Sequence, residues 1–373
     1  MLLLYIIIVL FIIYTLLILY YWKLWNVIPI FKSPDDKQTI SIRISIIIPA
    51  RNEEENIGKL LQALQVQSYP AELFEVIVVD DHSTDKTATI VQRFPSVKLI
   101  QLKEDQINSY KKKAIETGIA AANCEFIVTT DADCLPGKDW LKTIAAFKTE
   151  NRSVFIAAPV AFENNNSLLE IFQTMDFLVL QGITGASVYK NLHSMCNGAN
   201  LAYEKKAFND VNGFDGIDNI ASGDDMLLMH KIWKRYPDKV HYLKSKDAVV
   251  TTQPMKTWRS FFNQRIRWAS KAKNYDDKRI TAVLLLVYLF NLSFLVLIVA
   301  GFLCSCYWIW PLALWIAKTI IEFPFVNSIA SFFSKRSLMK YFLFFQPLHI
   351  LYTIISGFLG QIGKYEWKGR KVK

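Results

Sequence analysis

Apolar residues gather at the two ends of the chain. Residues 1–21 contain no charged side chain, and a run of this length can cross a bilayer as one helix. A cleaved signal peptide is the competing interpretation, but no positive charge precedes the run and no small-residue cleavage site follows it. Residues 1–25 are therefore predicted to be an N-terminal transmembrane anchor with its C-terminal flank in the cytoplasm.

The chain becomes apolar again from residue 280 onward. Residues 280–302 and 307–325 are long enough to span a membrane, and residues 342–362 form a third run that Pro347, Gly357 and Gly360 interrupt. Three spans would place the basic tail, residues 363–373, opposite the preceding domain, whereas its charge favours the cytoplasm. Residues 280–362 are predicted to hold two or three transmembrane helices, the last run spanning, re-entering or lying in the interface.

Short apolar runs alternate with helical patterns between these ends, after a polar linker at 26–41. Strands are predicted at 42–50, 74–81, 97–102 and 126–129, and helices from 57, from 83 or 84 to 94, and at 114–122. Asn52 is predicted to cap the first of these helices, with Glu55 in the reciprocal position. This order predicts an α/β fold with a doubly wound, mostly parallel sheet whose strands end along one edge.

Further elements are predicted as far as residue 271. Residues 140–147 and 168–180 read as helices, and residues 154–162 as a strand between them. Residues 222–225 form a turn that leads into an amphipathic helix, and residues 257–271 form a basic, aromatic helix. Residues 42–271 are therefore predicted to be one domain beside the membrane.

Composition and charge argue against some classes of function. Hydrophobic residues make up 52% of the chain and aromatic residues 14%, above the usual share for a soluble domain. The net charge of +10 could indicate nucleic-acid binding, but the basic residues flank the apolar segments, as they do on the cytoplasmic side of a membrane. The five cysteines contain no CxxC pair. We therefore expect no nucleic-acid partner, no structural zinc and a reducing compartment around the middle domain.

Acidic residues follow two of the predicted strands. Asp131 and Asp133 come directly after the strand at 126–129 and offer two hard oxygen ligands to a divalent cation that carries a diphosphate. Asp81 ends the strand at 74–81 and can accept hydrogen bonds from a ribose or a base. A solvated turn or a helix cap is the alternative role of Asp131 and Asp133, and a helix cap is the alternative role of Asp81. The glycine-rich phosphate loop of dinucleotide-binding folds is missing, so the phosphates must be neutralised in another way.

Two later groups carry the remaining chemistry. Asp224 and Asp225 can supply a general base, with capping of the next helix as the alternative, above all for Asp224. Gln264, Arg267 and Trp268 share one helix face, where arginine can pair with a phosphate and tryptophan can stack on a ring. A juxtamembrane helix that binds lipid head groups is the alternative there.

Five segments in this order resemble membrane-bound family 2 glycosyltransferases with the GT-A fold: IIIPARNEE, VVDDHSTD, TTDADC, SGDD and QRIRW, over roughly residues 42–271. The resemblance implies that Asp81 contacts the uridine of a nucleotide sugar, and that Asp133 with Asp131 binds Mg²⁺ or Mn²⁺ on the diphosphate. It makes Asp225 the catalytic base. Further binding residues implied by it are Pro49, Glu53 and either Lys112 or Lys113 around the nucleotide, and Gln264, Arg267 and Trp268 around the diphosphate and acceptor.

Two departures from the family pattern concern the base and the nucleotide pocket. His82 stands where glycine is commoner, and SGDD replaces the more usual Glu-Asp, so Asp224 could share the role of the base.

The expected function is that of an inverting, metal-dependent glycosyltransferase in the cell membrane, multi-pass, with its catalytic domain in the cytoplasm. It would move a sugar from a nucleotide-sugar donor, a UDP-sugar first, to a lipid or glycan acceptor. A processive polysaccharide synthase is the close alternative. A membrane-anchored, non-catalytic nucleotide-binding scaffold is the alternative from another class, and a nucleotidyltransferase fits the fold but not the QRIRW helix. The sequence does not identify the sugar or the acceptor.

Overall fold

The computed structural model describes residues 1–33, 41–105, 107, 109–163, 167–220, 223–362, 365–367 and 370–372, without the side chains of 273, 274 and those beyond 362. Its contacts divide the chain into two compact units. An α/β unit comprises Pro29–Glu163, Ser194–Gln253 and Trp367–Lys373, and a helical unit comprises Met1–Ile28, Asn164–His193 and Pro254–Glu366. Residues 34–40 of the predicted linker, Ser222 of the SGDD turn and part of the basic tail lie outside the described residues.

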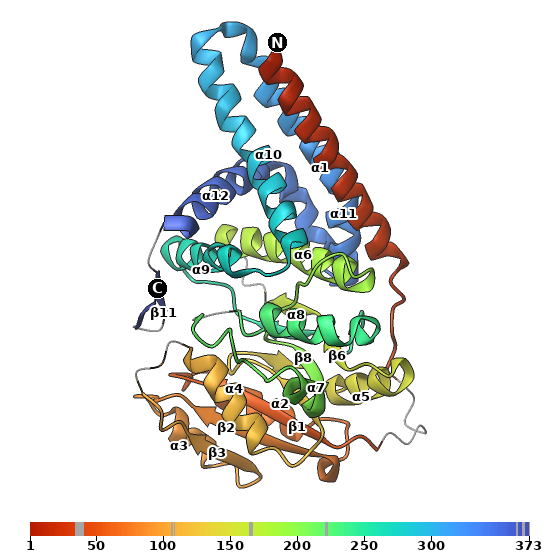
Figure 1. The fold of residues 1–373 in the computed structure, drawn as a ribbon, viewed down its shortest axis with the longest axis vertical. Helices are drawn as coiled ribbons and strands as arrows, with labels where there is room; N and C mark the ends of the chain where they lie inside the picture. The colour runs from red at the N-terminus through yellow and green to blue at the C-terminus, as the bar shows by residue number, and fades with distance from the viewer. Residues whose placement is uncertain are drawn as a thin grey trace. The chain divides into compact units, whose positions relative to one another are not determined.

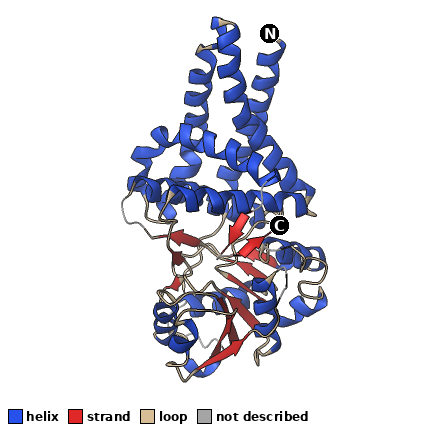
Figure 2. Cartoon of the chain, turned by 90° about the vertical axis from the view of Figure 1, so that its left-hand side faces the viewer, coloured by secondary structure: helices blue, strands red, loops and turns tan. Residues whose placement is uncertain are grey.

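Seven of the described strands form the central sheet of the α/β unit, in the order β3-β2-β1-β4-β8-β6-β9. Figure 1 labels β1, β2, β3, β6 and β8 of this sheet, and Figure 2 draws the strands in red. The pairs β1–β2, β1–β4, β2–β3 and β6–β9 are parallel, and β8 runs antiparallel to both of its neighbours. The predicted mostly parallel α/β sheet is therefore confirmed. The strands are β1 Ile44–Ala50, β2 Phe74–Asp80, β3 Val97–Gln101, β4 Phe126–Thr129, β6 Phe155–Ala157, β8 Leu201–Glu204 and β9 Val240–Tyr242.

Three helices connect the first four strands: α2 Ile57–Gln65, α3 Thr87–Val91 and α4 Tyr110–Ala120. Right-handed crossovers from β1 through β2 to β3 place α2 and α3 on one face of the sheet, and the return from β3 to β4 places α4 on the other. At Gly118 of α4, a Cβ atom would come within 2.5 Å of Ile47 Cγ2, so this helix lies close to the sheet because glycine leaves the space open.

Some of the predicted caps and element boundaries differ from the structure. Asn52 does not cap α2, whose N-cap is Asn56. The helix predicted from 83 or 84 to 94 is only α3, and the helix predicted at 168–180 extends over α6 Leu168–Tyr189. Residues 154–162 form two strands in different sheets, because Pro159 lies between β6 and β7 and cannot donate a hydrogen bond to a ladder.

The rest of the α/β unit surrounds this sheet. A second, three-stranded sheet has the order β5-β10-β7 within the described residues. Its strands are β5 Leu135–Pro136, β7 Val160–Phe162 and β10 Val250–Thr252, and the remaining helices are α5 Trp140–Asn151, α7 Lys205–Asp210 and α8 Met226–Arg235, with the 3-10 turns η1 Ala71–Leu73 and η2 Pro237–Lys239. In the tail, β11 Tyr365–Trp367 pairs with β12 Arg370–Val372.

The helical unit contains the apolar ends of the chain together with α6 and α9 Trp258–Ser270, both of which fall inside the predicted 42–271 domain. Four of its described helical stretches are long and apolar enough to cross a membrane: Leu2–Val27, Lys278–Leu303, Ser305–Phe332 and Arg336–Ile362. They contain α1 Leu2–Val27, α10 Lys278–Leu303, α11 Ile309–Phe332 and α12 Phe342–Ile362, with η4 Ser305–Tyr307 and η5 Arg336–Tyr341, while η3 Lys271–Asn274 follows α9.

Within the helical unit, α12 is arranged differently from the other apolar helices. In Figure 1, α1, α10 and α11 run side by side, whereas α12 runs at an angle to them. At Gly360 of α12, a Cβ atom would lie 2.7 Å from Ala269 Cβ and 3.0 Å from Ser270 N, so α12 packs closely against the end of α9. The third predicted apolar run, residues 342–362, therefore forms a helix that packs against the basic, aromatic helix α9.

Candidate active site

The carboxyl ends of β1, β2 and β4 meet at one edge of the central sheet. Ala50 is in register with Asp80, and the amide of Asp81 donates to the carbonyl of Ala50 at 2.8 Å. On the other side of β1, the amide of Thr130 donates to the carbonyl of Ile47 at 3.3 Å. The residues after these strands therefore share one edge, where open α/β sheets bind ligands.

The loops after β1 and β2 are tied to each other. The amide of Asn52 donates to Ser83 Oγ (2.9 Å), and Asn52 Oδ1 accepts from the amide of Thr84 (2.8 Å). Arg51 Nη1 donates to the carbonyl of Asp81 (2.8 Å) and lies 3.6 Å from its Oδ1. Asn52 thus serves as a bridge between loops, which explains why it does not cap α2.

The predicted nucleotide residues lie around this bridge. Asp81 is 3% exposed, Glu53 is buried, and Pro49 is half-buried at the end of β1. Glu53 Oε2 accepts from Asn56 Nδ2 at 2.8 Å. His82 has φ 52°, in the left-handed region that favours glycine, which explains why glycine is the commoner residue at this position.

Lys111, which was not among the predicted site residues, lies between two of the predicted acids. Nζ of Lys111, in α4, is 2.7 Å from Asp131 Oδ1 and 3.1 Å from Asp224 Oδ2. Burial lowers the pKa of Lys111, but the charges of Asp131 and Asp224 outweigh burial, so its pKa lies well above the ordinary value. The lysine is therefore a permanent cation that joins the acid after β4 to the acid before α8.

Asp225 rather than Asp224 is the N-cap of α8. Its Oδ1 accepts from the amide of Met226 (2.8 Å), and its Oδ2 accepts from the amide of Gly198 (3.2 Å). The alternative in which Asp224 only caps this helix is therefore wrong, and Asp224 pairs with Lys111. The hydrogen bonds from these two backbone amides orient the carboxylate of Asp225.

Gly198 lies at the most crowded point of this cluster. A Cβ atom there would be 3.1 Å from Asp224 Oδ2, 3.2 Å from Lys111 Nζ and 3.5 Å from Asp225 Cβ. The loop that contains Gly198 reaches this edge because β8 is antiparallel to β4 and so begins where β4 ends, with Thr130 Oγ1 donating to the carbonyl of Ala199 (2.9 Å).

The metal predicted at Asp131 and Asp133 needs a further partner. Both side chains are half-buried, and Asp133 Oδ1 lies 3.6 Å from Cys134 Sγ. Among the residues that the structure describes, no group of three His, Cys, Asp or Glu side chains could hold a metal ion. Mg²⁺ is commonly held by one or two carboxylates together with substrate phosphates. Two acids on one turn fit such an ion when a diphosphate supplies the other ligands.

The two lysines predicted near the nucleotide contact other groups of the protein. Lys112 is 2% exposed, and its Nζ donates to the carbonyls of Ile217 (2.7 Å) and Ile220 (2.5 Å). Lys113 Nζ lies 3.1 Å from Glu116 and 3.6 Å from Glu104. Lys111, directly before them in the chain, contacts both Asp131 and Asp224.

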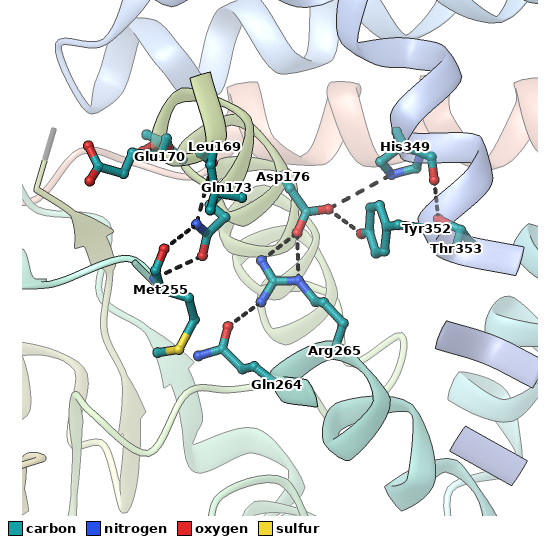
Figure 3. Close-up of polar contacts among 11 residues, drawn as sticks. Leu169, Glu170, Gln173, Asp176, Met255, Gln264, Arg265, His349, Tyr352 and Thr353 are labelled. Atoms are coloured by element: carbon teal, nitrogen blue, oxygen red, sulfur yellow. Dashed lines mark hydrogen bonds and ion pairs between the residues drawn. The ribbon is translucent and has the colours of Figure 1, made fainter. Parts of the chain in front are cut away.

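The predicted QRIRW residues belong to α9 of the helical unit. Gln264, Arg267 and Trp268 are half-buried there, and the residue between them, Arg265, is only 4% exposed. Arg265 pairs with Asp176 of α6 (Figure 3). The sequence reading missed this pair, because a single aspartate inside an apolar helix gives no local signal of its partner.

Comparison with known proteins agrees with the first three segments of the resemblance. Residues 45–211 match the model of glycosyl transferase family 2. The chain is 26% identical over 234 residues to the probable glycosyltransferase YdaM of Bacillus subtilis, covering 61% of this chain and 54% of that protein. It is 25% identical over 228 residues to a poly-beta-1,6-N-acetyl-D-glucosamine synthase of Staphylococcus epidermidis, covering 61% and 53%.

A shorter match and a solved structure complete the comparison. Over 113 residues the chain is 35% identical to the poly(ribitol-phosphate) beta-N-acetylglucosaminyltransferase TarS of Staphylococcus aureus, covering 30% of this chain and 20% of TarS. The chain thus spans about half the length of the first two relatives and a fifth of TarS. The mannosyltransferase PcManGT of Pyrobaculum calidifontis, in complex with GDP-Man and Mn²⁺, has a similar fold, with a TM-score of 0.61 at 20% identity over 92% of this chain and 98% of that one.

Proposed function

Residues 45–211 are a glycosyl transferase family 2 domain, and on this premise we propose that the protein is an inverting glycosyltransferase. It transfers a sugar from a nucleotide-sugar donor, a UDP-sugar first, to a lipid or glycan acceptor at the cytoplasmic face of the cell membrane. The observation that carries the proposal is the cluster of Lys111, Asp131, Asp224 and Asp225, which three distant segments bring to the ligand-binding edge of the sheet. A non-catalytic scaffold would not need the carboxylate of Asp225 to be oriented within this cluster.

Donor binding is assigned to the loops after β1 and β2. Asp81 accepts hydrogen bonds from the uridine, and Pro49 and Glu53 line the same pocket. The support is the bridge between these loops through Asn52 and Arg51, which holds them in place before a donor arrives. Preformed loops lose less conformational freedom when the donor binds.

We assign two sources of positive charge to the binding of the donor diphosphate. Lys111 is the protein's own cation at the edge, in place of the predicted Lys112 or Lys113. Asp131 and Asp133 would hold Mg²⁺ or Mn²⁺, which offsets the charge that grows on the departing diphosphate. PcManGT binds GDP-Man with Mn²⁺, which supports a divalent ion in this fold.

The transfer is assigned to a single displacement with Asp225 as the base. The acceptor hydroxyl loses its proton to the Asp225 carboxylate while its oxygen bonds to the anomeric carbon. The bond from that carbon to the diphosphate oxygen breaks at the same time, and its electron pair leaves with the nucleotide. Attack from the face opposite the leaving group inverts the anomeric carbon. Asp224, paired with Lys111, keeps that cation at the edge.

The acceptor is assigned to the membrane side. Gln264, Arg267 and Trp268 of α9 would contact the diphosphate and the acceptor, as the resemblance implies. We assign α1, α10 and α11 as spans and α12 to the membrane surface, because α12 runs at an angle to them and packs on α9. The two spans α10 and α11 then return the chain to its starting side, so the basic tail stays in the cytoplasm.

A nucleotide-release screen tests this proposal. Membranes or detergent extracts are given UDP-sugars and GDP-sugars in turn, with a chelator and then with Mn²⁺ or Mg²⁺. Release should require one donor class and the metal, and Asp225→Asn should lower it by about 100-fold. The exposed carboxylate of Asp218 provides the control, since Asp218→Asn should leave release unchanged. Full turnover by Asp225→Asn would remove Asp225 from the mechanism, and donor binding without release would favour the scaffold.

A processive polysaccharide synthase remains the second candidate, because one of the relatives is such a synthase. The two are separated by product size. A labelled product that migrates as one sugar on a lipid supports single transfer, and a ladder of increasing size supports polymerisation.

A further inference from the structure

Asp176 of α6 joins the QRIRW helix to α12. Its Oδ2 accepts two hydrogen bonds from Arg265, from Nε at 3.0 Å and from Nη2 at 2.7 Å. Its Oδ1 accepts the hydroxyl of Tyr352, and His349 Nε2 lies 3.9 Å from the same oxygen (Figure 3). Asp176 is 5% exposed and Arg265 4%, so this ion pair is shielded from water.

Arg265 in turn contacts two residues of the QRIRW segment. Its Nη1 donates to Gln264 Oε1 at 2.6 Å, and its guanidinium carbon lies 4.3 Å from the centre of the Trp268 ring. The centre of the Phe261 ring lies 4.7 Å from the same guanidinium carbon. A guanidinium is planar with its N–H groups in a rigid fork. The hydrogen bonds to Asp176 therefore fix the plane of the Arg265 guanidinium. That plane sets the direction of the N–H that donates to Gln264 and the face that lies over the Trp268 ring.

Two polar side chains of α12, nearly two turns apart, hold this helix against its neighbours. Tyr352 bonds to Asp176, and Gln346 accepts from Lys318 Nζ and donates to Glu322 Oε2, each at 2.5 Å. Residues three apart on a helix share a face, so His349 lies between these two anchors. Such bonds fix helix positions where water cannot replace them.

We propose that Asp176 and Arg265 are positioning residues for the transfer, and that Tyr352 of α12 completes their arrangement. Through Arg265, Asp176 sets the orientation of Gln264 and Trp268, and Tyr352 restrains the second oxygen of Asp176. The proposal rests on the proposed function, in which Gln264 and Trp268 contact the diphosphate and the acceptor. A merely structural ion pair, which holds the helices together and nothing more, is the competing account.

Arg265→Lys separates the two accounts. A lysine can still pair with Asp176, which retains the ion pair, but it cannot also donate to Gln264 and present a plane to Trp268. Amide exchange, followed by mass spectrometry on purified protein in detergent, should accelerate about tenfold over residues 264–270. The melting temperature should stay close to that of wild type. The exposed Arg259 of the same helix is the control, since Arg259→Lys should change neither.

Two tyrosines form a matched pair for the role of α12. Tyr352 donates its hydroxyl to the buried Asp176, and Tyr14 donates its hydroxyl to the buried Glu322 in the same unit. Tyr352→Phe should accelerate exchange over residues 264–270, and Tyr14→Phe should not. Unchanged exchange in both Arg265→Lys and Tyr352→Phe would overturn the proposal, whether or not a donor has been found.

The activity measurement uses the donor selected by the release screen. With a donor, acceptor-dependent transfer should fall about tenfold in Arg265→Lys and Tyr352→Phe, while Arg259→Lys transfers at the wild-type rate and all three variants keep a melting temperature close to that of wild type. Parallel loss of transfer and melting temperature would identify the pair as structural and overturn the proposal. If wild-type protein releases nucleotide from no donor, the proposed function fails, and the exchange comparison still decides the positioning.

Discussion

Nζ of Lys111 lies 2.7 Å from Oδ1 of Asp131. An acid expected to bind a metal is thus already paired with a cation from the protein. Under the proposed function, a divalent ion and Lys111 would share the same negative charge. The donor diphosphate would supply the additional negative charge that lets both cations remain.

Replacing Lys111 should impair turnover. Lys111→Met removes the charge between Asp131 and Asp224, and we expect nucleotide release to fall by about 100-fold, as when one group that stabilises developing charge is lost. The measurement is release at saturating Mn²⁺ and donor. Lys113→Met is the matched control, because its partners Glu104 and Glu116 are exposed and such pairs contribute about 1 kcal/mol or less. Wild-type release by Lys111→Met would contradict the role of Lys111 at the diphosphate.

A methyl group at Gly198 should disturb the same cluster without unfolding the protein. In Gly198→Ala the new Cβ approaches Asp224 Oδ2 to 3.1 Å and Lys111 Nζ to 3.2 Å, so both must shift by a few tenths of an ångström. We expect release to fall by about tenfold, since small displacements of reacting groups are costly, with little change in melting temperature.

A second glycine provides the control for this change. Gly58 lies in α2, and its added Cβ would meet Ile90 Cγ2 at an ordinary 3.4 Å. Gly58→Ala should retain activity and gain about 0.5 kcal/mol of stability from helix propensity. A Gly198→Ala variant as active as Gly58→Ala would show that the cluster tolerates displacement.

Cysteine labelling tests which side of the membrane holds the α10–α11 connection. Cys304 and Cys306 are exposed between these helices, whereas Cys124, Cys134 and Cys196 are buried in the α/β unit. Burial and the charge of Asp133 raise the pKa of Cys134, which keeps that thiol protonated and unreactive. A membrane-impermeant maleimide should therefore label intact cells, and the Cys304→Ser, Cys306→Ser double variant should remain unlabelled. Labelling that appears only after permeabilisation would place this connection in the cytoplasm.

Lys244 should make stability depend on alkaline pH. It is 5% exposed, and burial lowers its pKa to about 8. Between this value and the pKa of about 10.4 of an unfolded lysine, the unfolded chain binds a proton that the folded chain does not, so stability rises with pH. Lys244→Met should add about 2 kcal/mol of stability below pH 8, and this gain should fade toward pH 10.5.

Thermal unfolding in detergent at pH 7, 8, 9 and 10 measures this difference. The exposed Lys246 is the control, and Lys246→Met should show no pH-dependent difference from wild type. A gain for Lys244→Met that stays constant up to pH 10 would mean that it comes from packing rather than from titration.

Local periodicity accounts for what could be predicted from the sequence. Alternating apolar strands and helical faces predict the parallel sheet, and parallel strands must end on one edge, so the approach of Asp81 and Asp131 to the same edge follows from their position after β2 and β4. The lengths of the apolar runs likewise predict helices that can cross a membrane.

Contacts between distant segments decided the rest. Lys111, Lys112 and Lys113 are consecutive on one helix, and only the rotation of α4 against the sheet determines that Lys111 meets Asp131 and Asp224. Gly198 joins them because β8 is antiparallel, which no local pattern indicates. Asp176 and Arg265 are 89 residues apart, so their ion pair depends on how α6 packs against α9. The sequence by itself determined the order of the elements and the acids at their ends, and the tertiary structure decided which cations those acids meet.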